Sequence, residues 1–258
     1  MEKQIVLWCI MSKILVIGDS CRDVFVYCES DRLCPDVPVP VLNVIDQKDN
    51  PGMAKNVQRN IKSLGAMCEI KTNSNWFDYT KTRYMHAKSN HMFLRVDSNS
   101  IIKRADIKDI DYRYDIIVIS DYDKGYLLEE DIEQICNNHP LVFLDTKKVI
   151  GRWCRKAAFI KINNNEYSRS KSSMDDCMQE KIIVTKGSDG CVYNGKHYGV
   201  DRVDVMDVSG AGDTFMACLV CEYVKSKDIA SSIRLANKGA SEAVRHRGVT
   251  CIGDLIKL

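Results

Sequence analysis

The sequence carries almost no net charge. Its 37 Lys and Arg residues against 35 Asp and Glu residues leave a formal charge of +2, so the chain lacks the overall positive field with which proteins attract nucleic acid. With 45% hydrophobic and 28% charged residues, its composition is that of an ordinary globular protein that can bury a full core. We therefore expect neither a nucleic-acid-binding protein nor a disordered one.

Long hydrophobic runs are also missing. The apolar run near the N-terminus, residues 5–11, is far shorter than the roughly 20 residues that span a bilayer, and no small-residue cleavage site follows it. We expect no membrane contact and a cytoplasmic location. Because a strand-like run begins at Lys13, residues 1–10 are either an added strand or an upstream start of no consequence.

Paired cysteine motifs and linkers are scarce. Twelve cysteines are scattered at irregular spacings, which predicts reduced thiols in a cytosolic protein and not a disulfide framework. The Cys-x-x-Cys at Cys218 and Cys221 falls in an apolar helical pattern without a second pair to complete a zinc site, so both are predicted core residues. No low-complexity linker or repeat divides the chain, and we expect one domain over residues 1–258.

Short apolar runs bounded by turn residues are typical of strands buried on both faces. These runs are residues 14–17, 116–119, 141–144, 157–160 and 182–184. Parallel strands need helices between them, and the helical candidates are residues 53–64, 129–137, 211–224 and 229–244. The alternation predicts a doubly wound α/β fold of three layers. Residues 23–45 and 79–97 alternate like strands and are expected to form a small second sheet.

Two glycines mark the place where a strand-like run, residues 203–208, gives way to a helix. Gly210 and Gly212 let backbone amides approach an anion closely, which predicts an oxyanion cradle that includes Ala211. Asp213 falls in the first helical turn, where the helix dipole is expected to keep its carboxylate ionised and its pKa low. Such a weak base is enough for phosphoryl transfer. The alternative is a plain capped helix start.

Other nucleotide-binding patterns do not fit this segment. No Gly-Lys-Ser or Gly-Lys-Thr follows, as a P-loop requires, and the third glycine of a dinucleotide fingerprint is missing. Residues 207–215 are instead similar to the C-terminal signature of the PfkB or ribokinase-like carbohydrate kinases, Asp-Thr-x-Gly-Ala-Gly-Asp-x-Phe. The resemblance implies a ribokinase-like αβα sandwich with a small β-sheet lid, ATP as donor, a sugar or sugar phosphate as acceptor, and Asp213 as the base.

A second family motif implies a metal. Residues 163–166 resemble the family's Asn-x-x-Glu, whose residues organise Mg²⁺ and its waters near the nucleotide phosphates. The resemblance therefore implies that Asn163 and Glu166 serve Mg²⁺, directly or through water, as hard oxygen ligands should.

Two further stretches resemble nucleotide-binding positions of the family. Residues 185–190 are similar to its Thr-x-Gly-x-x-Gly, which implies nucleotide contacts by Thr185, Gly187 and Gly190. The same stretch is also typical of a simple hairpin turn. Asn237 resembles a position near the adenine pocket, although an Asn on an amphipathic helix otherwise faces solvent.

The N-terminal part resembles the family's acceptor site. Asp23 lies where the family has a carboxylate that holds sugar hydroxyls. Residues 51–56 look like the first signature, in which a Gly-Gly pair and an Asn form the floor of the pocket, and this implies that Gly52 and Asn56 bind sugar. Met53 stands in place of the second glycine, and its side chain should narrow or reshape the pocket.

Residues 32–41 narrow the resemblance to the heptose-7-phosphate kinases, which have Arg-Ile-Ser-Pro-Glu-Ala-Pro-Val-Pro-Val there. Other motifs of that group have counterparts at residues 80–83, 95–97, 120–125 and 145–147. The resemblance implies cationic ligands for a substrate phosphate, and the alternative for each is a structural ion pair. The candidates are Lys81, Arg83, Lys124 and Lys147.

The chain also departs from the family. Residues 66–79 are shorter than in typical members, so a helix and a strand are expected to be missing there, and residues 168–180 form a short connection. A nucleotide- or sugar-binding relative without turnover, acting as a regulator, is therefore a rival hypothesis, and a dinucleotide-dependent oxidoreductase is a weaker third.

Bifunctional relatives add a nucleotidyltransferase domain, for which we expect no counterpart. The family's lid can pair between subunits, so a homodimer is a hypothesis.

Overall fold

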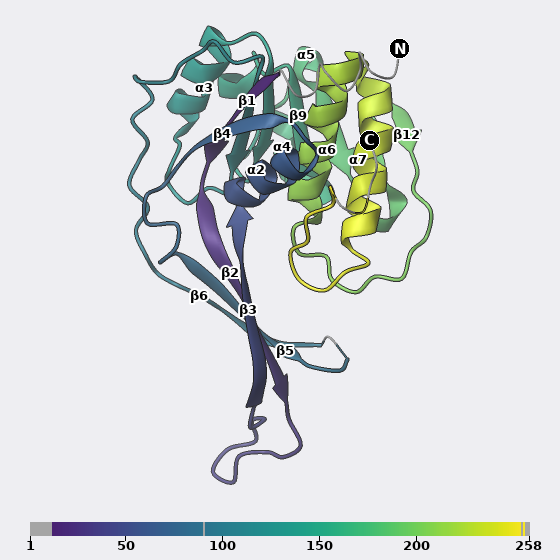
Figure 1. Ribbon diagram of the computed structural model, residues 1–258. Helices are drawn as coiled ribbons and strands as arrows, with labels where there is room; N and C mark the ends of the chain where they lie inside the picture. Colours follow the sequence, from purple (N-terminus) through teal and green to yellow (C-terminus); the bar gives the residue numbers. More distant parts are fainter. Residues whose placement is uncertain (1–11, 90, 254, 256–258) are drawn as a thin grey trace.

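The computed structural model describes residues 12–89, 91–253 and 255, and the expectation for residues 1–10 concerns positions outside them. Two sheets organise these residues, one of eight strands and one of four. The larger sheet lies among the helices, and the smaller sheet extends away from this body as a long arm (Figure 1).

The large sheet has the strand order β12-β11-β10-β9-β8-β7-β1-β4. Its strands are β1 Lys13–Gly18, β4 Met67–Thr72, β7 Ile116–Asp121, β8 Val142–Thr146, β9 Phe159–Asn163, β10 Ile182–Thr185, β11 Cys191–Tyr193 and β12 Lys196–Tyr198. Neighbours from β4 to β10 pair in parallel, whereas β11 and β12 add an antiparallel edge. Every residue of β7 and β8 is buried, as their continuous apolar runs predict for strands covered on both faces.

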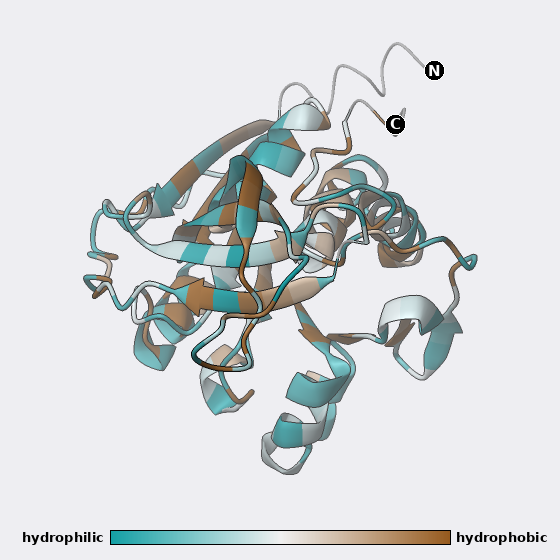
Figure 2. Ribbon diagram, turned by 90° about the horizontal axis from the view of Figure 1, so that it is seen from below, coloured by the Kyte–Doolittle hydropathy of each residue, from teal (hydrophilic) through white to brown (hydrophobic). Residues whose placement is uncertain are grey.

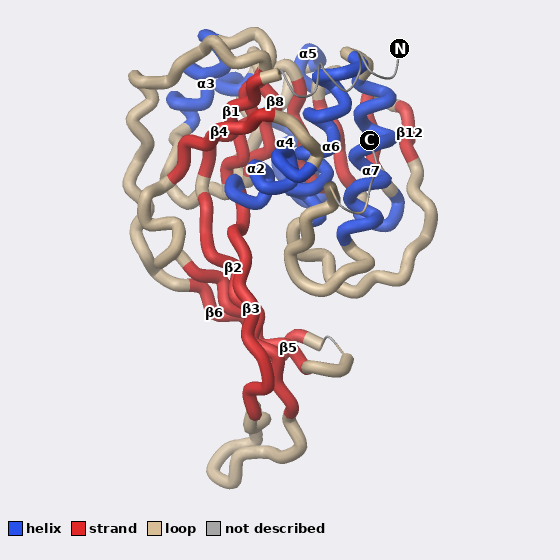
Figure 3. Tube along the Cα trace, in the orientation of Figure 1, coloured by secondary structure: helices blue, strands red, loops and turns tan. Residues whose placement is uncertain are grey.

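Helices cover both faces of this sheet (Figure 3). They are α2 Ala54–Ser63, α3 Glu129–Asn138, α4 Asn164–Ser170, α5 Asp176–Gln179, α6 Ala211–Ser226 and α7 Ile229–Ala243, with single 3-10 turns at Arg152–Cys154, Lys171–Ser173 and Gly187–Asp189. Successive strand side chains point to opposite faces. Ile14 and Val16 of β1 accordingly join the core cluster under α2, α6 and α7, while Leu15 and Ile17 join the cluster under α3. The predicted three layers are therefore confirmed.

One predicted strand is wrong. Residues 203–208 form a loop before α6, and Val205 and Val208 are exposed. Strand β12 already forms the edge of the sheet, and the amides of Met206 and Asp207 donate instead to the carbonyl of Val244. The apolar residues of this loop thus have no neighbouring strand to pair with.

The small sheet contains β2 Ser20–Glu29, β3 Asn43–Met53, β5 Thr80–His86 and β6 Met92–Asp97, in the order β3-β2-β5-β6. Both stretches expected to supply lid strands do so, although β3 begins only at Asn43 and continues to Met53. The proline-rich residues 32–41 form the loop between β2 and β3, held by one bridge between Leu33 and Pro40. Hydrophobic and hydrophilic segments alternate along the strands (Figure 2).

The shortened segment, residues 66–79, is described throughout and contains strand β4 followed by a turn. No helix lies between these two positions, and the expectation that a helix and a strand are missing relative to typical members stays a prediction. In the turn, the Trp76 and Phe77 rings pack edge to face at 5.6 Å. The Lys55 ammonium and the Arg22 guanidinium each lie 4.2 Å from the centre of one of these rings, so cation–π contacts hold the short turn against the rest of the fold.

Two simpler expectations concern hydrophobic segments. Cys218 and Cys221 are fully buried, as predicted for core residues. Within the described part of the chain, no helix combines the length and apolar character needed to cross a bilayer.

Strands β1 and β7 approach closely at Gly18, where an added Cβ would lie 1.8 Å from the carbonyl oxygen of Ser120. We predict that Gly18→Ala lowers the free energy of unfolding by about 1–3 kcal/mol, the usual cost of overpacking. Urea denaturation measures this. Gly199→Ala is the control, because the nearest atom to its Cβ would be 3.6 Å away, and a similar loss there would contradict the explanation.

Candidate active site

Polar side chains gather where the parallel strands end. Asp121 ends β7, Thr146 ends β8, Asn163 ends β9 and Thr185 ends β10. The carboxyl ends of parallel strands meet at one edge of an open sheet, which is where such folds bind their ligands. The N-terminus of α6, with Asp213 in its first turn, lies at this same edge.

Asp213 is held by two other segments of the chain. Its Oδ1 accepts a 2.5 Å hydrogen bond from the Tyr122 hydroxyl, and its Oδ2 accepts one of 2.9 Å from Asn56 Nδ2. Asn56 is fixed in turn by Asn60, whose Nδ2 donates to Asn56 Oδ1 at 3.1 Å. The carboxylate is only 3% exposed, so its orientation is set by groups from α2 and from the loop after β7.

The pKa of Asp213 is raised to about 6 because burial disfavours its charged form, an effect that the hydrogen bonds from Tyr122 and Asn56 only partly oppose. The expectation of a low pKa is therefore wrong. Desolvation at this position outweighs the helix dipole, whose effect is typically below about 1 kcal/mol at exposed sites. A carboxylate that titrates near neutral pH is a better proton acceptor than the sequence suggested.

The loop that carries Tyr122 is itself fixed by Asp19, which follows β1. Asp19 accepts hydrogen bonds from the backbone amides of Tyr122 at 2.7 Å and Tyr126 at 3.2 Å. Burial and the neighbouring Asp121 raise the pKa of Asp19 to about 6. Asp19 thus acts on the backbone and positions Tyr122.

The glycines before Asp213 allow two close approaches. Gly210, the N-cap of α6, has φ 78°, and an added Cβ would lie 2.8 Å from Asn56 Nδ2. A Cβ on Gly212 would lie 2.9 Å from Lys161 Nζ. A plain capped helix start requires neither approach. The amide of Ala211 donates to the carbonyl of Val208 at 3.3 Å, whereas helix geometry leaves the amides of Gly212 and Asp213 without an intrahelical acceptor.

A row of alternating charges leads from this helix start toward β9 and α4. Lys161 Nζ donates to Asp145 Oδ2 at 2.7 Å, and Lys147 Nζ donates to Glu166 Oε1 at 2.7 Å and lies 3.8 Å from Asp145 Oδ1. Burial would raise the pKa of Asp145, but Lys161 and Lys147 hold it below its ordinary value. Lys161 is only 4% exposed, so an ammonium group lies inside the fold beside Gly212.

Sequence reasoning gave no role to several of these residues, among them Tyr122 and Lys161. Tyr122 stood inside a quoted motif, residues 120–125, but was given no role. Lys161 interrupts the apolar run of β9, whose residues Ile160 to Ile162 are buried. The predicted strand, residues 157–160, ended before Lys161, and the available signal was the apolar Ile162 beyond it. A strand that continues to Ile162 places Lys161 among buried residues, where an unpaired charge is costly.

The predicted nucleotide residues divide into two groups. A hollow of about 390 Å³ at the ends of β9 and β10 is lined by Asn163, Thr185 and Gly187, among others. Glu166 is buried beside it and forms a reciprocal capping box with Asn163, in which each side chain accepts the other residue's backbone amide. The structure therefore brings both motifs, which lie 22 residues apart between Asn163 and Thr185, to one site.

Gly190 and Asn237, the other predicted nucleotide residues, are not among the residues that line this hollow. An added Cβ on Gly190, which has φ 78°, would be 2.1 Å from the Tyr198 carbonyl oxygen, and Asn237 Nδ2 donates to that oxygen at 2.8 Å. Asn237 is buried, so it does not face solvent. Both residues join the β10–β12 hairpin to α7 in this structure.

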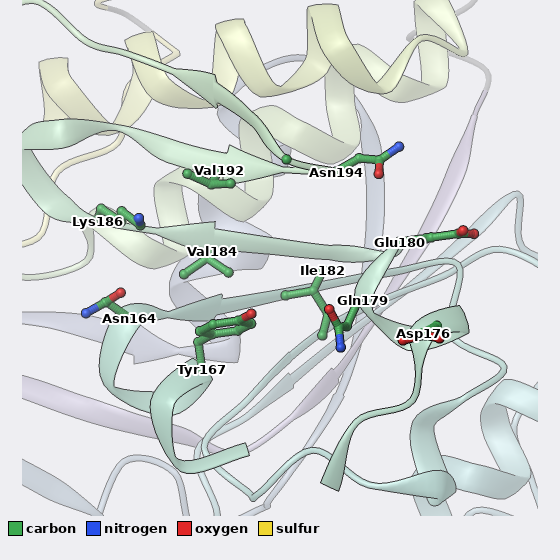
Figure 4. A pocket seen from close by; sticks show the side chains of 11 residues that line it. Asn164, Tyr167, Asp176, Gln179, Glu180, Ile182, Val184, Lys186, Val192 and Asn194 are labelled. Carbon is green, nitrogen blue, oxygen red and sulfur yellow. The ribbon is translucent and has the colours of Figure 1, made fainter. Parts of the chain in front are cut away.

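A second hollow of about 510 Å³ adjoins the first, because Asn164 and Lys186 line both. Figure 4 shows Tyr167 of α4 beside Ile182 and Val184 of β10. Helix α5 has only 4 residues, and the short connection over residues 168–180 leaves this part of the sheet open.

The predicted acceptor residues meet between the two sheets. Arg83 donates to Asp23 Oδ1 at 2.6 Å, and a Cβ on Gly52 would lie 2.1 Å from Asp23 Oδ2. Strand pairing places Lys81 opposite Asp23, and Lys81 Nζ lies 4.9 Å from the centre of the Tyr122 ring. The acceptor candidates on β2, β3 and β5 thus lie beside the groups that hold Asp213.

The four predicted phosphate ligands have different surroundings. Lys81 is buried, Arg83 is paired with Asp23, and Lys147 is paired with Glu166. Lys124 is exposed, and its backbone amide bonds Asp19. The structure therefore brings Lys81 and Arg83 beside Tyr122 and Asp23, brings Lys147 beside Glu166, and leaves the Lys124 side chain at the surface.

The family of this chain follows from a comparison with protein-family models. A family model described as pfkB family carbohydrate kinase matches residues 78–253, which is more than half of the chain. The chain therefore belongs to this family.

Several curated relatives carry the same name. The chain is 27% identical over 296 aligned positions to the bifunctional protein HldE of Hydrogenovibrio crunogenus, covering 95% of this chain and 62% of that protein. It is 28% identical over 297 positions to HldE of Helicobacter acinonychis, covering 92% and 64%. The chain thus spans less than two thirds of the length of these relatives.

Solved structures support the fold. A nucleoside kinase of Methanocaldococcus jannaschii, an archaeal member of the ribokinase family, matches with a TM-score of 0.70 at 18% identity and 93% coverage of both chains. Ribokinase of Thermotoga maritima matches with a TM-score of 0.70 at 15% identity, covering 93% of this chain and 95% of the other. The ribokinase-like sandwich predicted from the sequence is confirmed.

The Tyr122 hydroxyl lowers the pKa of Asp213 by donating to its charged form. We predict that Tyr122→Phe raises this pKa further. Because the base acts only when deprotonated, the acid limb of the kcat/KM profile should move to higher pH, by about one unit, and activity should fall more at pH 6 than at pH 8.

The control for this experiment is Tyr112→Phe. The Tyr112 hydroxyl is buried, without a hydrogen-bond partner among the described residues, and it packs against the α3 cluster. An acid limb that stays in place in Tyr122→Phe, or moves to lower pH, would contradict the assigned hydrogen bond.

Proposed function

We propose that this kinase transfers the γ-phosphoryl group of ATP to a hydroxyl of a sugar phosphate, heptose 7-phosphate in the first instance. One observation carries the proposal: a buried carboxylate at a glycine-flanked helix start is fixed by Tyr122 and Asn56, between an acceptor side and a nucleotide-side hollow. The heptose assignment rests on the resemblance of residues 32–41 and of the Thr-Lys-Thr-Arg stretch, residues 80–83. We take the two sheets as one kinase domain.

In the proposed reaction, Asp213 accepts the proton of the attacking hydroxyl as its oxygen bonds to phosphorus and the bond to the ADP oxygen breaks. The amides of Gly212 and Asp213 point from the helix start toward the transferring group, where partial positive charge is most useful. Lys161, 2.9 Å from the Cβ position of Gly212, adds a positive charge beside them. Tyr122 and Asn56 keep the carboxylate oriented while this happens.

On the acceptor side, Asp23 and Gly52 would contact sugar hydroxyls, with Asn56 at the floor. Arg83 neutralises Asp23, and Lys81 is buried beside Tyr122. A phosphorylated sugar would bring an anion to these two cations, and such charge-assisted contacts are stronger than neutral hydrogen bonds.

Mg²⁺ would be held near Asn163 and Glu166. Glu166 Oε1 already accepts from Lys147 and Asn163 Nδ2, but Oε2 and Asn163 Oδ1 each accept a single backbone amide, which leaves each of them one further acceptor position. These residues therefore fit a hydrated ion held through water, as Mg²⁺ prefers. Across the described residues, no cluster of three or more His, Cys, Asp or Glu side chains forms a direct site. The ion would neutralise phosphate charge.

The rival hypothesis is a binding protein without turnover. It would require no oriented base, yet Asp213 keeps both hydrogen-bond donors and its pKa lies near neutrality, at about 6. Nucleotide contacts by Thr185 and Gly187 suit either hypothesis, whereas the complete surroundings of Asp213 favour the kinase.

The test is Mg²⁺-dependent ADP release from ATP with heptose 7-phosphate, ribose, fructose and fructose 6-phosphate. We predict stimulation by a sugar phosphate, and a loss of at least ~100-fold in turnover for Asp213→Asn with nucleotide binding retained. Near-normal turnover of Asp213→Asn would refute the base. Absence of stimulation by every acceptor, despite ATP binding, would favour the binding protein.

We also propose that two copies pair through the small sheet. Its edge strands β3 and β6 expose Val44, Ile45, Leu94 and Val96, and open apolar edges favour pairing with another chain.

Light scattering at micromolar concentration should then give twice the chain mass of 29.3 kDa. The double variant Val44→Lys with Leu94→Lys should be monomeric, because charges on edge strands oppose pairing. The control is Ile101→Lys, a position that is 89% exposed and lies outside the sheet. A monomeric mass for the unaltered protein would contradict the proposal.

A further inference from the structure

Met53 has an unusual backbone for a long side chain. Its φ is 61° and its ψ −132°, in a region that residues other than glycine rarely adopt. The other described non-glycine residues with positive φ are Asp123, Asn194 and Lys227. Met53 alone among these four is buried, with 2% of its surface exposed. An unfavourable conformation at a buried position suggests that the side chain has a use.

The side chain of Met53 reaches the acceptor side. Its Sδ lies 3.0 Å from Lys81 Nζ, and that ammonium lies 4.9 Å from the centre of the Tyr122 ring. The hydroxyl of the same ring donates to Asp213. Three successive contacts therefore connect Met53 to the base.

The ammonium of Lys81 makes no ion pair among the described residues. Asp97, its partner across β5 and β6, interacts with it only at longer range and is ion-paired with Arg95 at 2.6 Å. Lys81 is 7% exposed, and no carboxylate in the described chain lies within 4.0 Å of its Nζ; the nearby Asp23 is taken by Arg83 at 2.6 Å. A thioether sulfur is a weak acceptor, and a buried cation without a partner is costly. The site is thus arranged to gain an anion, and Met53 holds the cation that would receive it.

We propose that Met53 is a specificity-determining residue, which positions the Lys81 ammonium for an anionic acceptor. This inference rests on the proposed function and deepens it: the acceptor class is phosphorylated sugars, selected through Met53 and Lys81. A glycine at position 53 would leave the ammonium without its sulfur contact.

The first test compares kcat/KM for a sugar phosphate with that for the same sugar without phosphate. We expect Met53→Gly to reduce this ratio by at least about tenfold, through a higher KM for the phosphorylated acceptor with kcat changed by no more than about threefold. Met53→Leu keeps the bulk of the side chain but not the sulfur, so its ratio should lie between those of the unaltered protein and of Met53→Gly. Lys81→Met should abolish the preference.

Relief of backbone strain is controlled separately. Lys227→Gly relieves the strain of a side chain at a positive φ of 53° at the end of α6 and should leave the ratio unchanged. A ratio within about twofold of the unaltered protein in both Met53 variants would overturn the proposal.

A binding experiment keeps the inference testable if Met53→Gly does not fold or if no acceptor is turned over. With methyl-¹³C methionine, the Met53 resonance is identified by its loss in Met53→Leu. It should shift when a sugar phosphate is added without ATP, and not when the free sugar is added. An unmoved resonance at saturating sugar phosphate would overturn the role of Met53, whereas a shift without ADP formation would leave that role intact and count against the proposed kinase activity alone.

Discussion

The burial of one carboxylate constrains much of this structure. Asp213 must be kept out of water for its pKa to lie at about 6, yet a buried charge needs hydrogen-bond donors. Tyr122 and Asn56 supply them from segments 91 and 157 residues away in sequence. Helix α2, helix α6 and the loop after β7 therefore have to meet at one point, and glycine at position 210 is what allows the approach.

Near Asp213, lysine and carboxylate side chains alternate in a row. Asp145, with two lysines beside it, separates Lys161 from Lys147, and Glu166 ends the row within the capping box of α4. Buried ion pairs contribute little net stability, because desolvation offsets their attraction. These ion pairs instead fix the positions of flexible lysine side chains. The carboxylates hold the two ammonium groups at the edge of the large sheet, where the proposed function would place phosphate groups.

The sequence predicted the order of the main strands and helices, because buried parallel strands leave continuous apolar runs and helices leave a 3.6-residue period. The strand prediction failed at residues 203–208, where the apolar run has no neighbouring strand to pair with. A local sequence pattern does not say which strands are neighbours in a sheet. The sequence singled out Asp213, Gly210 and Asn56 through motifs, but not the hydrogen bond from Asn56 to Asp213 or the close approach of Gly210 to Asn56. The raised pKa of Asp213 could not be predicted, since desolvation depends on what tertiary packing brings around a residue.

Strand β3 passes into helix α2 without an intervening loop, since Met53 is the last residue of the one and Ala54 the first of the other. The small sheet and the helix that carries Asn56 are therefore directly connected. The chain changes direction between them at Met53, whose backbone lies in a restricted region. Any tilt of the sheet would reach the Asp213 hydrogen bond within one helical turn. The proposed acceptor contacts at Asp23 and Gly52 thus lie on a strand pair that leads directly into the helix holding Asn56.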